Sequence, residues 1–394
     1  MTFTSVGLPA LEDLAPIDQA EHARMCSRIV RVLQEEGGYM DFERFMELVL
    51  YEPELGFYQR ETGQFGDEGS FTTAPEMGPL FARCLAQPCR QVLDEVGGVV
   101  LEVGAGRGTL ACDLLLALQS AGALPDEYLI LERSAALRRR QSALLDTLDE
   151  PLRGRVRWVN EAPEMRGIVI ANEVLDALPV QRFEVFADDV RPLGVTLDGG
   201  SFQWRTGPSD RDLTAWYEEL RGSLFELLPV GYRSERCRQL ASTMARFCGP
   251  LERGVVLFVD YGYTRATYYH PQRTDGTLMC HFKHRAHSDP FVFAGLQDVT
   301  ASVDFTAVAR VGEQLGMTVA GYTSQTWFLL GCGLQAVLAS LRAGEFTRQA
   351  QVAKKLLMPG EMGERVHALA LARGFEQPLE AFALRDRSGR LASD

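Results

Sequence analysis

The sequence lacks the features of a membrane-spanning or disulfide-stapled protein. It contains no run approaching the roughly eighteen apolar residues of a transmembrane helix, and its first residues lack a cationic stretch followed by an apolar core. Its eight cysteines are scattered without a C-x-x-C pair, which predicts reduced thiols rather than a disulfide or zinc framework. We therefore expect a cytoplasmic protein without membrane insertion.

Positive charge is also scarce. Forty Lys and Arg residues stand against 53 Asp and Glu residues, so the formal net charge is −13. Such a surface repels nucleic acid, and we expect no nucleic-acid partner. The chain has 394 residues, of which 46% are hydrophobic, so it can form a full α/β domain and a second substantial unit.

A glycine-rich turn near residue 104 is the most informative stretch of the chain. Residues 99–103 form a continuous apolar run that predicts a buried parallel strand, and a leucine-rich helix follows at 110–118. Between them lie Gly104, Ala105, Gly106 and, two residues on, Gly108. Glycines permit positive φ and let a ligand approach the backbone. The turn therefore predicts a small-molecule site.

Two kinds of glycine turn resemble this one. In the dinucleotide fingerprint G-x-G-x-x-G/A, a helix N-terminus faces a diphosphate. Here the third glycine comes one residue early, and Glu102 ends the strand, where its charge would repel a diphosphate but suit a cationic amine. The pattern E-x-G-x-G-x-G resembles motif I of class I methyltransferases, which bind S-adenosyl-L-methionine. Glu132, after the next apolar run at 128–131, is placed to accept both ribose hydroxyls.

Strands and helices alternate beyond the turn, which predicts an α/β fold with a doubly wound, Rossmann-like parallel sheet. Two N-terminal helices are expected to cover this core, and residues 180–205 alternate as antiparallel hairpins do. The expected segments are 1–96, N-terminal helices and a cofactor and substrate loop; 97–179, the first part of the core; 180–250, an inserted α+β substrate subdomain; 251–332, the second part of the core with a His-rich loop; and 333–394, a C-terminal helical tail.

Acids and amides follow several predicted strands, at the edge where open α/β sheets bind ligands. Asn172 and Glu173 begin a sharp turn that continues through Asp176 to Pro179. Carboxylates there suit a cationic or proton-losing acceptor, so Glu173 is our first catalytic candidate and Asp176 the second. Asp260 and Tyr261, after the apolar run 255–259, are assigned to substrate binding.

Histidines recur every third residue at 281, 284 and 287, which raises the possibility of a metal site. The stretch 280–287 also carries two cations and no acid that could help to neutralise a metal. We therefore expect no metal, and we assign His284 and His287 to a substrate-facing loop.

Seven separated segments together resemble one family, the MidA-like methyltransferases, which include a mitochondrial complex I assembly factor that methylates a protein arginine. In chain order, these segments are 51–58, 66–76, 102–110, 172–179, 231–235, 260–262 and 297–305. The resemblance implies a class I methyltransferase fold. It also implies that the loop residues Thr73, Pro75 and Glu76 line the cofactor pocket with the glycine turn and Asn172.

The resemblance implies an S-adenosyl-L-methionine-dependent enzyme that methylates an arginine of a partner protein. A respiratory-complex subunit is the first candidate partner, and a second copy of the chain, in a homodimer, is another candidate. Two alternatives stay open: methylation of a small molecule or RNA, and a cofactor-binding assembly factor without turnover.

Overall fold

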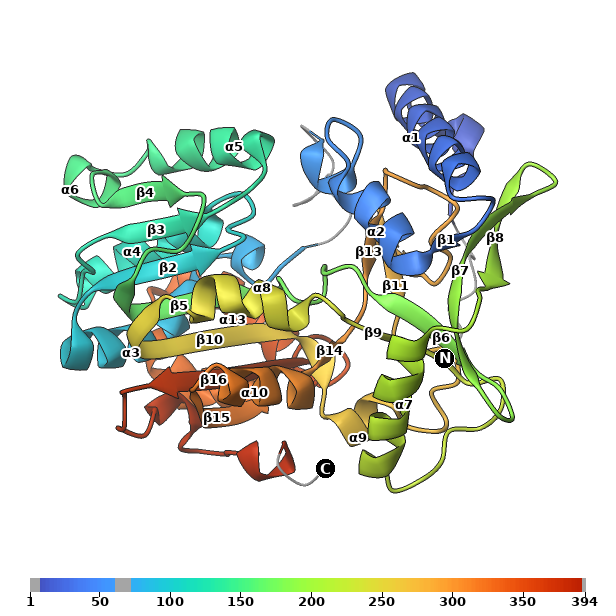
Figure 1. Ribbon diagram of the computed structural model, residues 1–394. Coiled ribbons are helices and arrows are strands. Elements are labelled where there is room, and N and C mark those ends of the chain that lie inside the picture. The colour runs from blue at the N-terminus through green and yellow to red at the C-terminus, as the bar shows by residue number, and fades with distance from the viewer. Residues whose placement is uncertain (1–7, 61–71, 392–394) are drawn as a thin grey trace.

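The computed structural model describes residues 8–60 and 72–391 (Figure 1). Residues Gly66, Asp67 and Phe71, which contribute to the family resemblance, lie outside these ranges. Two units lie side by side in Figure 1, a large one built on the long central sheet and a smaller one with two sheets of its own. In the described part of the chain, no helix combines the length and apolar character needed to cross a membrane.

The large unit is built on a mixed sheet whose main path runs β15-β16-β10-β5-β2-β3-β4, with β14 paired to β10. Strands β10, β5, β2, β3 and β4 are mutually parallel, as predicted, and β14 is parallel to β10 as well. The bounds are β2 Val99–Val103, β3 Tyr128–Leu131, β4 Val156–Val159, β5 Met165–Asn172, β10 Leu251–Tyr263, β14 Val303–Asp304, β15 Thr318–Ser324 and β16 Val366–Arg373. Strand β16 is antiparallel to both of its neighbours, so the sheet as a whole is mixed rather than parallel throughout.

Strand β16 also corrects the expected helical tail at 333–394. Its sequence, VHALALAR, is rich in alanine and leucine, which favour helices in isolation. In the folded chain this segment lies between β15 and β10, with seven of its eight residues buried. Pairing on both edges and burial on both faces outweigh the local preference.

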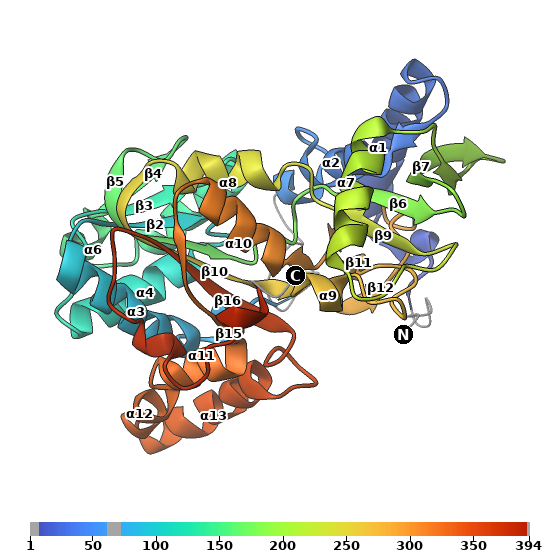
Figure 2. The ribbon, with the colours of Figure 1, turned by 60° about the horizontal axis from the view of Figure 1, so that its bottom comes forward.

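Helices cover both faces of this sheet (Figure 2), which confirms the α/β, doubly wound prediction. Alternate residues of β5 point to opposite faces, so Ile168 and Ile170 pack with one helical layer and Val169 and Ala171 with the other. The first layer contains α3 Leu80–Val96, α4 Thr109–Ser120, α11 Gln325–Gly331, α12 Leu334–Ala339 and α13 Ala343–Leu357. The second contains α8 Leu240–Cys248 and α10 Phe305–Gln314. Helices α5 Ala135–Leu145 and α6 Glu150–Arg153 connect β3 to β4.

The smaller unit combines a five-stranded sheet, of order β1-β7-β6-β9 with β8 on β7, and a three-stranded sheet of order β12-β11-β13. Its strands are β1 Met40–Asp41, β6 Gln181–Val185, β7 Val190–Asp198, β8 Ser201–Thr206, β9 Arg233–Arg236, β11 Met279–Phe282, β12 Arg285–His287 and β13 Asp298–Thr300. Its helices are α1 Pro16–Glu35, α2 Phe42–Tyr51, α7 Arg211–Ser223 and α9 Arg265–Tyr268. Short 3₁₀ turns lie at Leu11–Asp13, Phe57–Gln59, Pro75–Met77, Glu380–Phe382 and Ser388–Arg390.

We had expected the N-terminal helices α1 and α2 to cover the large sheet, but they do not. Their apolar faces pack instead against the smaller unit, where Ile29 and Phe45 share a core with Val195 of β7 and Val299 of β13. The amphipathic pattern predicted that these helices bury one face. It carried no information about which sheet they would cover, and the domain boundaries as a whole stay a prediction.

Candidate active site

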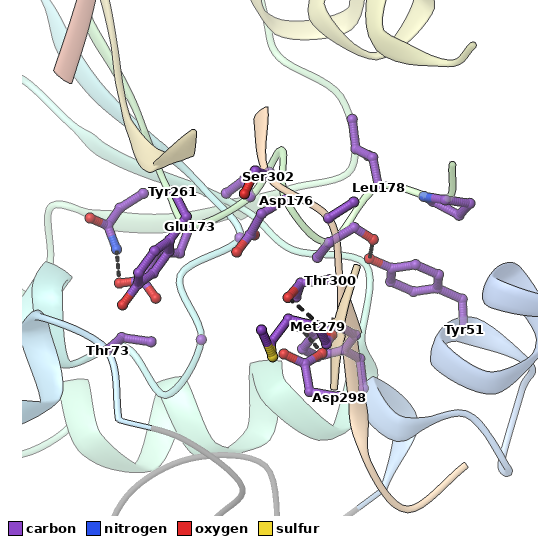
Figure 3. Close-up of a pocket in the computed structure, with 18 of the residues that line it drawn as sticks. Tyr51, Thr73, Glu173, Asp176, Leu178, Tyr261, Met279, Asp298, Thr300 and Ser302 are labelled. Carbon is purple, nitrogen blue, oxygen red and sulfur yellow. Dashed lines mark hydrogen bonds between the residues drawn. The ribbon is translucent and has the colours of Figure 1, made fainter. Parts of the chain in front are cut away.

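A cavity of about 1290 Å³ lies where the carboxyl ends of β2, β3 and β5 face the smaller unit. Its lining comes from both units: the glycine turn and the turn after β5 on one side, and strands β11 and β13 on the other. Figure 3 shows the part of this cavity around Glu173, Asp176 and Asp298. The cavity therefore coincides with the sheet edge predicted from the sequence.

The glycine turn forms one end of the cavity. Gly104 and Gly106 both line it and both have positive φ, 65° and 53°. Glu102 lies beneath the turn and is 3% exposed, with one carboxylate oxygen accepting a 2.6 Å hydrogen bond from the Tyr128 hydroxyl. Burial raises the pKa of Glu102 to about 7. A cationic amine beside this carboxylate would stabilise its charged form.

Glu132 stands at the tip of β3 and is linked to the glycine turn through one glutamine. Its two oxygens accept hydrogen bonds from the Ser134 amide, at 2.8 Å, and from the Gln141 side chain, at 3.2 Å. Gln141 also donates to the carbonyl of Gly106, at 2.9 Å. Since each carboxylate oxygen has two lone pairs, Glu132 can still accept from a diol in the cavity.

The loop before α3 closes this end of the cavity through Thr73, Pro75 and Glu76. Thr109, the first residue of α4, donates a 2.6 Å hydrogen bond to Glu76, and the Arg107 guanidinium lies 3.6 Å from the other oxygen. The carboxylate of Glu76 thus fastens the loop to the helix that follows the glycine turn.

Gly108 differs from the other two glycines, because it does not line the cavity. Its φ is 89°, and a Cβ at this position would meet the Cα of Gln141 at 3.2 Å. Its assignment to cofactor binding is corrected accordingly: Gly108 allows the start of α4 to approach α5.

The residues of this end fit S-adenosyl-L-methionine. Buried Glu102 suits the amine, the glycine turn presents bare backbone, and Glu132 suits a ribose diol. Asn172 lines the same cavity, and the buried oxygen of its side-chain amide, Oδ1, has no hydrogen-bond partner among the described residues. A donor from a ligand in the cavity would satisfy this oxygen.

The turn after β5 forms the other end. Glu173 has a φ of 51°, a left-handed conformation that is strained for a non-glycine residue and is found disproportionately at functional sites. Among the described residues, its carboxylate accepts two hydrogen bonds, both long at 3.4 Å, from the Ala74 amide and the Asn172 side chain. Burial and, next, the charge of Asp260 raise the pKa of Glu173 to about 8.

Asp260 does not reach the cavity, which corrects its assignment to substrate binding. It is fully buried beneath the turn. One oxygen accepts from the amides of Val174, Leu175 and Asp176 at 3.1, 2.8 and 3.4 Å, and the other accepts from the Tyr261 amide at 2.8 Å. Asp260 therefore holds the strained turn in place, while Tyr261 itself lines the cavity.

The structure adds groups to this end that our site assignment missed: Asp298 and the stacked pair Tyr51 and Tyr58. Asp176 is 8% exposed and Asp298 is 2% exposed. Burial, with the neighbouring charges of Asp260, Glu173 and Asp298 next, raises the pKa of Asp176 well above its usual range. All three missed residues fall inside segments that resemble the family, so the signal was present, although nothing local linked residues 51 and 298.

Histidines 284 and 287 do not line the cavity, so their assignment to substrate binding is also corrected. His284 is exposed on the turn between β11 and β12, and His287 is buried in the smaller unit beside Phe293. The strand alternation points His281 into the cavity instead, and burial lowers its pKa to about 4, which keeps it neutral. Within the described residues, no group of three or more His, Cys, Asp or Glu side chains could hold a metal.

Comparisons with known proteins agree with this geometry. Residues 80–323 match the model of an S-adenosyl-L-methionine-dependent methyltransferase family. A crystal structure from Burkholderia thailandensis, with S-adenosyl-homocysteine bound, is 39% identical; the match covers 97% of this chain and all of that one, with a TM-score of 0.90. A native structure from the same organism has a TM-score of 0.88, with the same identity and coverage.

Curated relatives match at lower identity over most of the chain. The Drosophila melanogaster protein named "Protein arginine methyltransferase NDUFAF7 homolog, mitochondrial" is 26% identical, with 86% of this chain and 82% of the relative covered. The Mus musculus protein named "Protein arginine methyltransferase NDUFAF7, mitochondrial" is also 26% identical, with 85% and 81% covered. Because these relatives are named as mitochondrial, the expectation of a cytoplasmic protein is contradicted.

Proposed function

This chain belongs to the S-adenosyl-L-methionine-dependent methyltransferases, and from that premise we propose that it methylates an arginine side chain of a partner protein. The predicted fold class, cofactor and enzyme class are confirmed by the family match and by the similar structure that holds S-adenosyl-homocysteine. The names of the curated relatives support arginine as the acceptor. The resemblance makes a respiratory-complex subunit the first partner to test.

One observation carries the proposal: carboxylates gather at the acceptor end of the cavity, and no cation in the described part of the chain pairs with them. Among the described residues, Glu173, Asp176 and Asp298 form no ion pair with any Lys, Arg or His side chain. Buried carboxylates are costly unless they are paired or protonated. A cationic acceptor side chain would complete this end of the site.

The chemistry requires these groups to act on a poor nucleophile. When bound, S-adenosyl-L-methionine supplies a methyl group on its sulfonium sulfur. An arginine side chain has a pKa above about 12 and is a weak nucleophile while charged. We assign Glu173 to hold the guanidinium by charge-assisted hydrogen bonds, so that one nitrogen faces the methyl donor. The proton lost from that nitrogen passes to a cavity carboxylate, and the raised pKa of Glu173 suits it to receive a proton.

The experiment is mass spectrometry of proteins from a deletion strain and its parent, followed by transfer of labelled methyl groups from S-adenosyl-L-methionine by the purified protein. We expect methylarginine to disappear from a defined protein in the deletion strain and to be restored in vitro. Label in a small molecule or in RNA would refute the proposal, and so would cofactor binding without any transfer.

A further inference from the structure

Asp298 reaches the acceptor end of the cavity through strand alternation. Strand β13 pairs with β11 so that Asp298 lies opposite His281 and Thr300 lies opposite Met279. All four of these residues line the cavity, whereas Val299, between Asp298 and Thr300, packs in the core of the smaller unit. This alternation is the ordinary period of a strand. It gives the smaller unit one carboxylate that faces the turn after β5.

Two tyrosines fix the position of Asp298 relative to that turn. The Tyr58 hydroxyl donates a 2.9 Å hydrogen bond to Asp298, and the Tyr51 hydroxyl donates one of 2.8 Å to the carbonyl of Ala177 in the turn. The two rings stack with centroids 5.5 Å apart. In addition, the Ala301 amide donates directly to the carbonyl of Asp176, at 2.9 Å. These contacts hold Asp298 of the smaller unit in a fixed position relative to the turn that carries Glu173 and Asp176.

Figure 3 shows Asp176 and Asp298 approaching the same space from two sides, with Glu173 and Tyr261 beside it. The planar guanidinium group has five N–H donors that point outward in several directions. Carboxylates on one side alone would leave some of these donors unpaired in a buried site, at a cost. A carboxylate facing them from the other unit removes that cost.

We infer that Asp298 is a further acceptor-binding residue, which holds the guanidinium from the side of the smaller unit while Glu173 and Asp176 hold it from the turn. This inference rests on the proposed function. It makes the acceptor site a joint product of both units, with Tyr58 as a positioning residue for Asp298.

The electrostatic surroundings of Asp298 agree with this role. Burial raises the pKa of Asp298 to about 7, and the hydrogen bond from Tyr58 acts in the opposite direction. Among the described residues, the titratable groups that face Asp298 or interact with its charge are Tyr51, Tyr58, Glu173, Asp176, Cys280 and His281. None of these is a cation at neutral pH, since His281 is held neutral.

The test compares Asp298→Asn and Tyr58→Phe with the wild-type protein and with Asp198→Asn as the matched control. Asp198 is exposed at the end of β7 in the same unit, away from the cavity. Each protein is incubated with labelled S-adenosyl-L-methionine and the protein extract of a deletion strain. Initial rates of methylarginine formation are measured from pH 6 to pH 9, and S-adenosyl-homocysteine affinity is measured by calorimetry.

We expect Asp298→Asn to lower the rate by about 100-fold or more, because it removes a charge from a buried ion pair. Its affinity for S-adenosyl-homocysteine should stay within about threefold, since no cofactor group is altered. In Tyr58→Phe the pKa of Asp298 rises, so the acid limb of the pH profile should move to higher pH. A merely structural role would not move that limb.

Each outcome is decisive. If the wild type forms methylarginine and Asp298→Asn does so within about threefold of the wild-type rate, the inference about Asp298 is overturned and the proposed function stands. An unmoved acid limb in Tyr58→Phe overturns it as well, even if Asp298→Asn fails to fold. If the wild type labels no arginine, the proposed function fails and the inference fails with it.

Discussion

Replacing Glu173 with glutamine should abolish most methyl transfer while leaving the fold and the cofactor site intact. The change is nearly isosteric, and glutamine retains an oxygen that can accept from the Ala74 amide and the Asn172 side chain. It removes the charge that we assign to hold and polarise the acceptor guanidinium. Losing one side of a buried, charge-assisted pair costs roughly 3 to 5 kcal/mol, which is about two to four orders of magnitude in kcat/KM.

The structure separates this prediction from a purely structural role for Glu173. The two hydrogen bonds that described residues donate to its carboxylate are 3.4 Å long, whereas Asp260 holds the same turn through amide contacts as short as 2.8 Å. Weak hydrogen bonds contribute little, so Tm should fall by no more than about 3 °C in Glu173→Gln. Asp176→Asn should impair transfer less if Asp176 mainly orients the turn.

The assay measures Tm, S-adenosyl-homocysteine affinity and kcat/KM toward an identified arginine acceptor on the same samples. Glu164→Gln is the matched control. Glu164 is exposed just before β5 and away from the cavity, so this substitution makes the same change of charge outside the site. Transfer by Glu173→Gln within a few-fold of wild type would refute the reasoning. A large loss of Tm together with activity would instead favour the structural role.

Three further predictions concern the cofactor, metals and pH. Gly106→Val should abolish S-adenosyl-homocysteine binding, because a branched side chain at a φ of 53° is strained and would fill the cavity; undiminished affinity of the folded variant in calorimetry would count against the site. Treatment with a chelator should leave methyl transfer unchanged, and one stoichiometric transition metal with activity lost on chelation would overturn that expectation. The kcat/KM for the acceptor should rise with pH through about 7 to 8, because Asp298 and Glu173, with pKa values of about 7 and 8, attract a cation only after losing their protons. A profile that is flat from pH 6 to pH 9 would contradict it.

The sequence by itself determined the glycine turn and the acid before it, which form the end of the site that we assign to the cofactor. Residues 102 to 108 are adjacent in the chain, so the order of strand, acid, glycine turn and helix could be read directly. The turn at 172–179 could be placed at the same edge, because parallel strands of an α/β sheet end together there. Local sequence patterns of this kind predict the elements that carry a site when all residues of the pattern lie close together in the sequence.

Only the tertiary structure decided the acceptor end. Asp298 lies 125 positions after Glu173 in the chain, and it reaches the cavity because β13 pairs with β11 in a unit whose packing the local pattern does not specify. The same limit explains the misassigned residues: a strand tip predicted that Asp260 would face a ligand, but its oxygens turn inward to the amides of the bend. Strand β16 was missed because alanine and leucine suit a helix until two neighbouring strands supply their hydrogen bonds. Contacts between distant segments decide where Asp298, Asp260 and β16 lie. Such contacts produce no periodic pattern in the sequence from which they could be predicted.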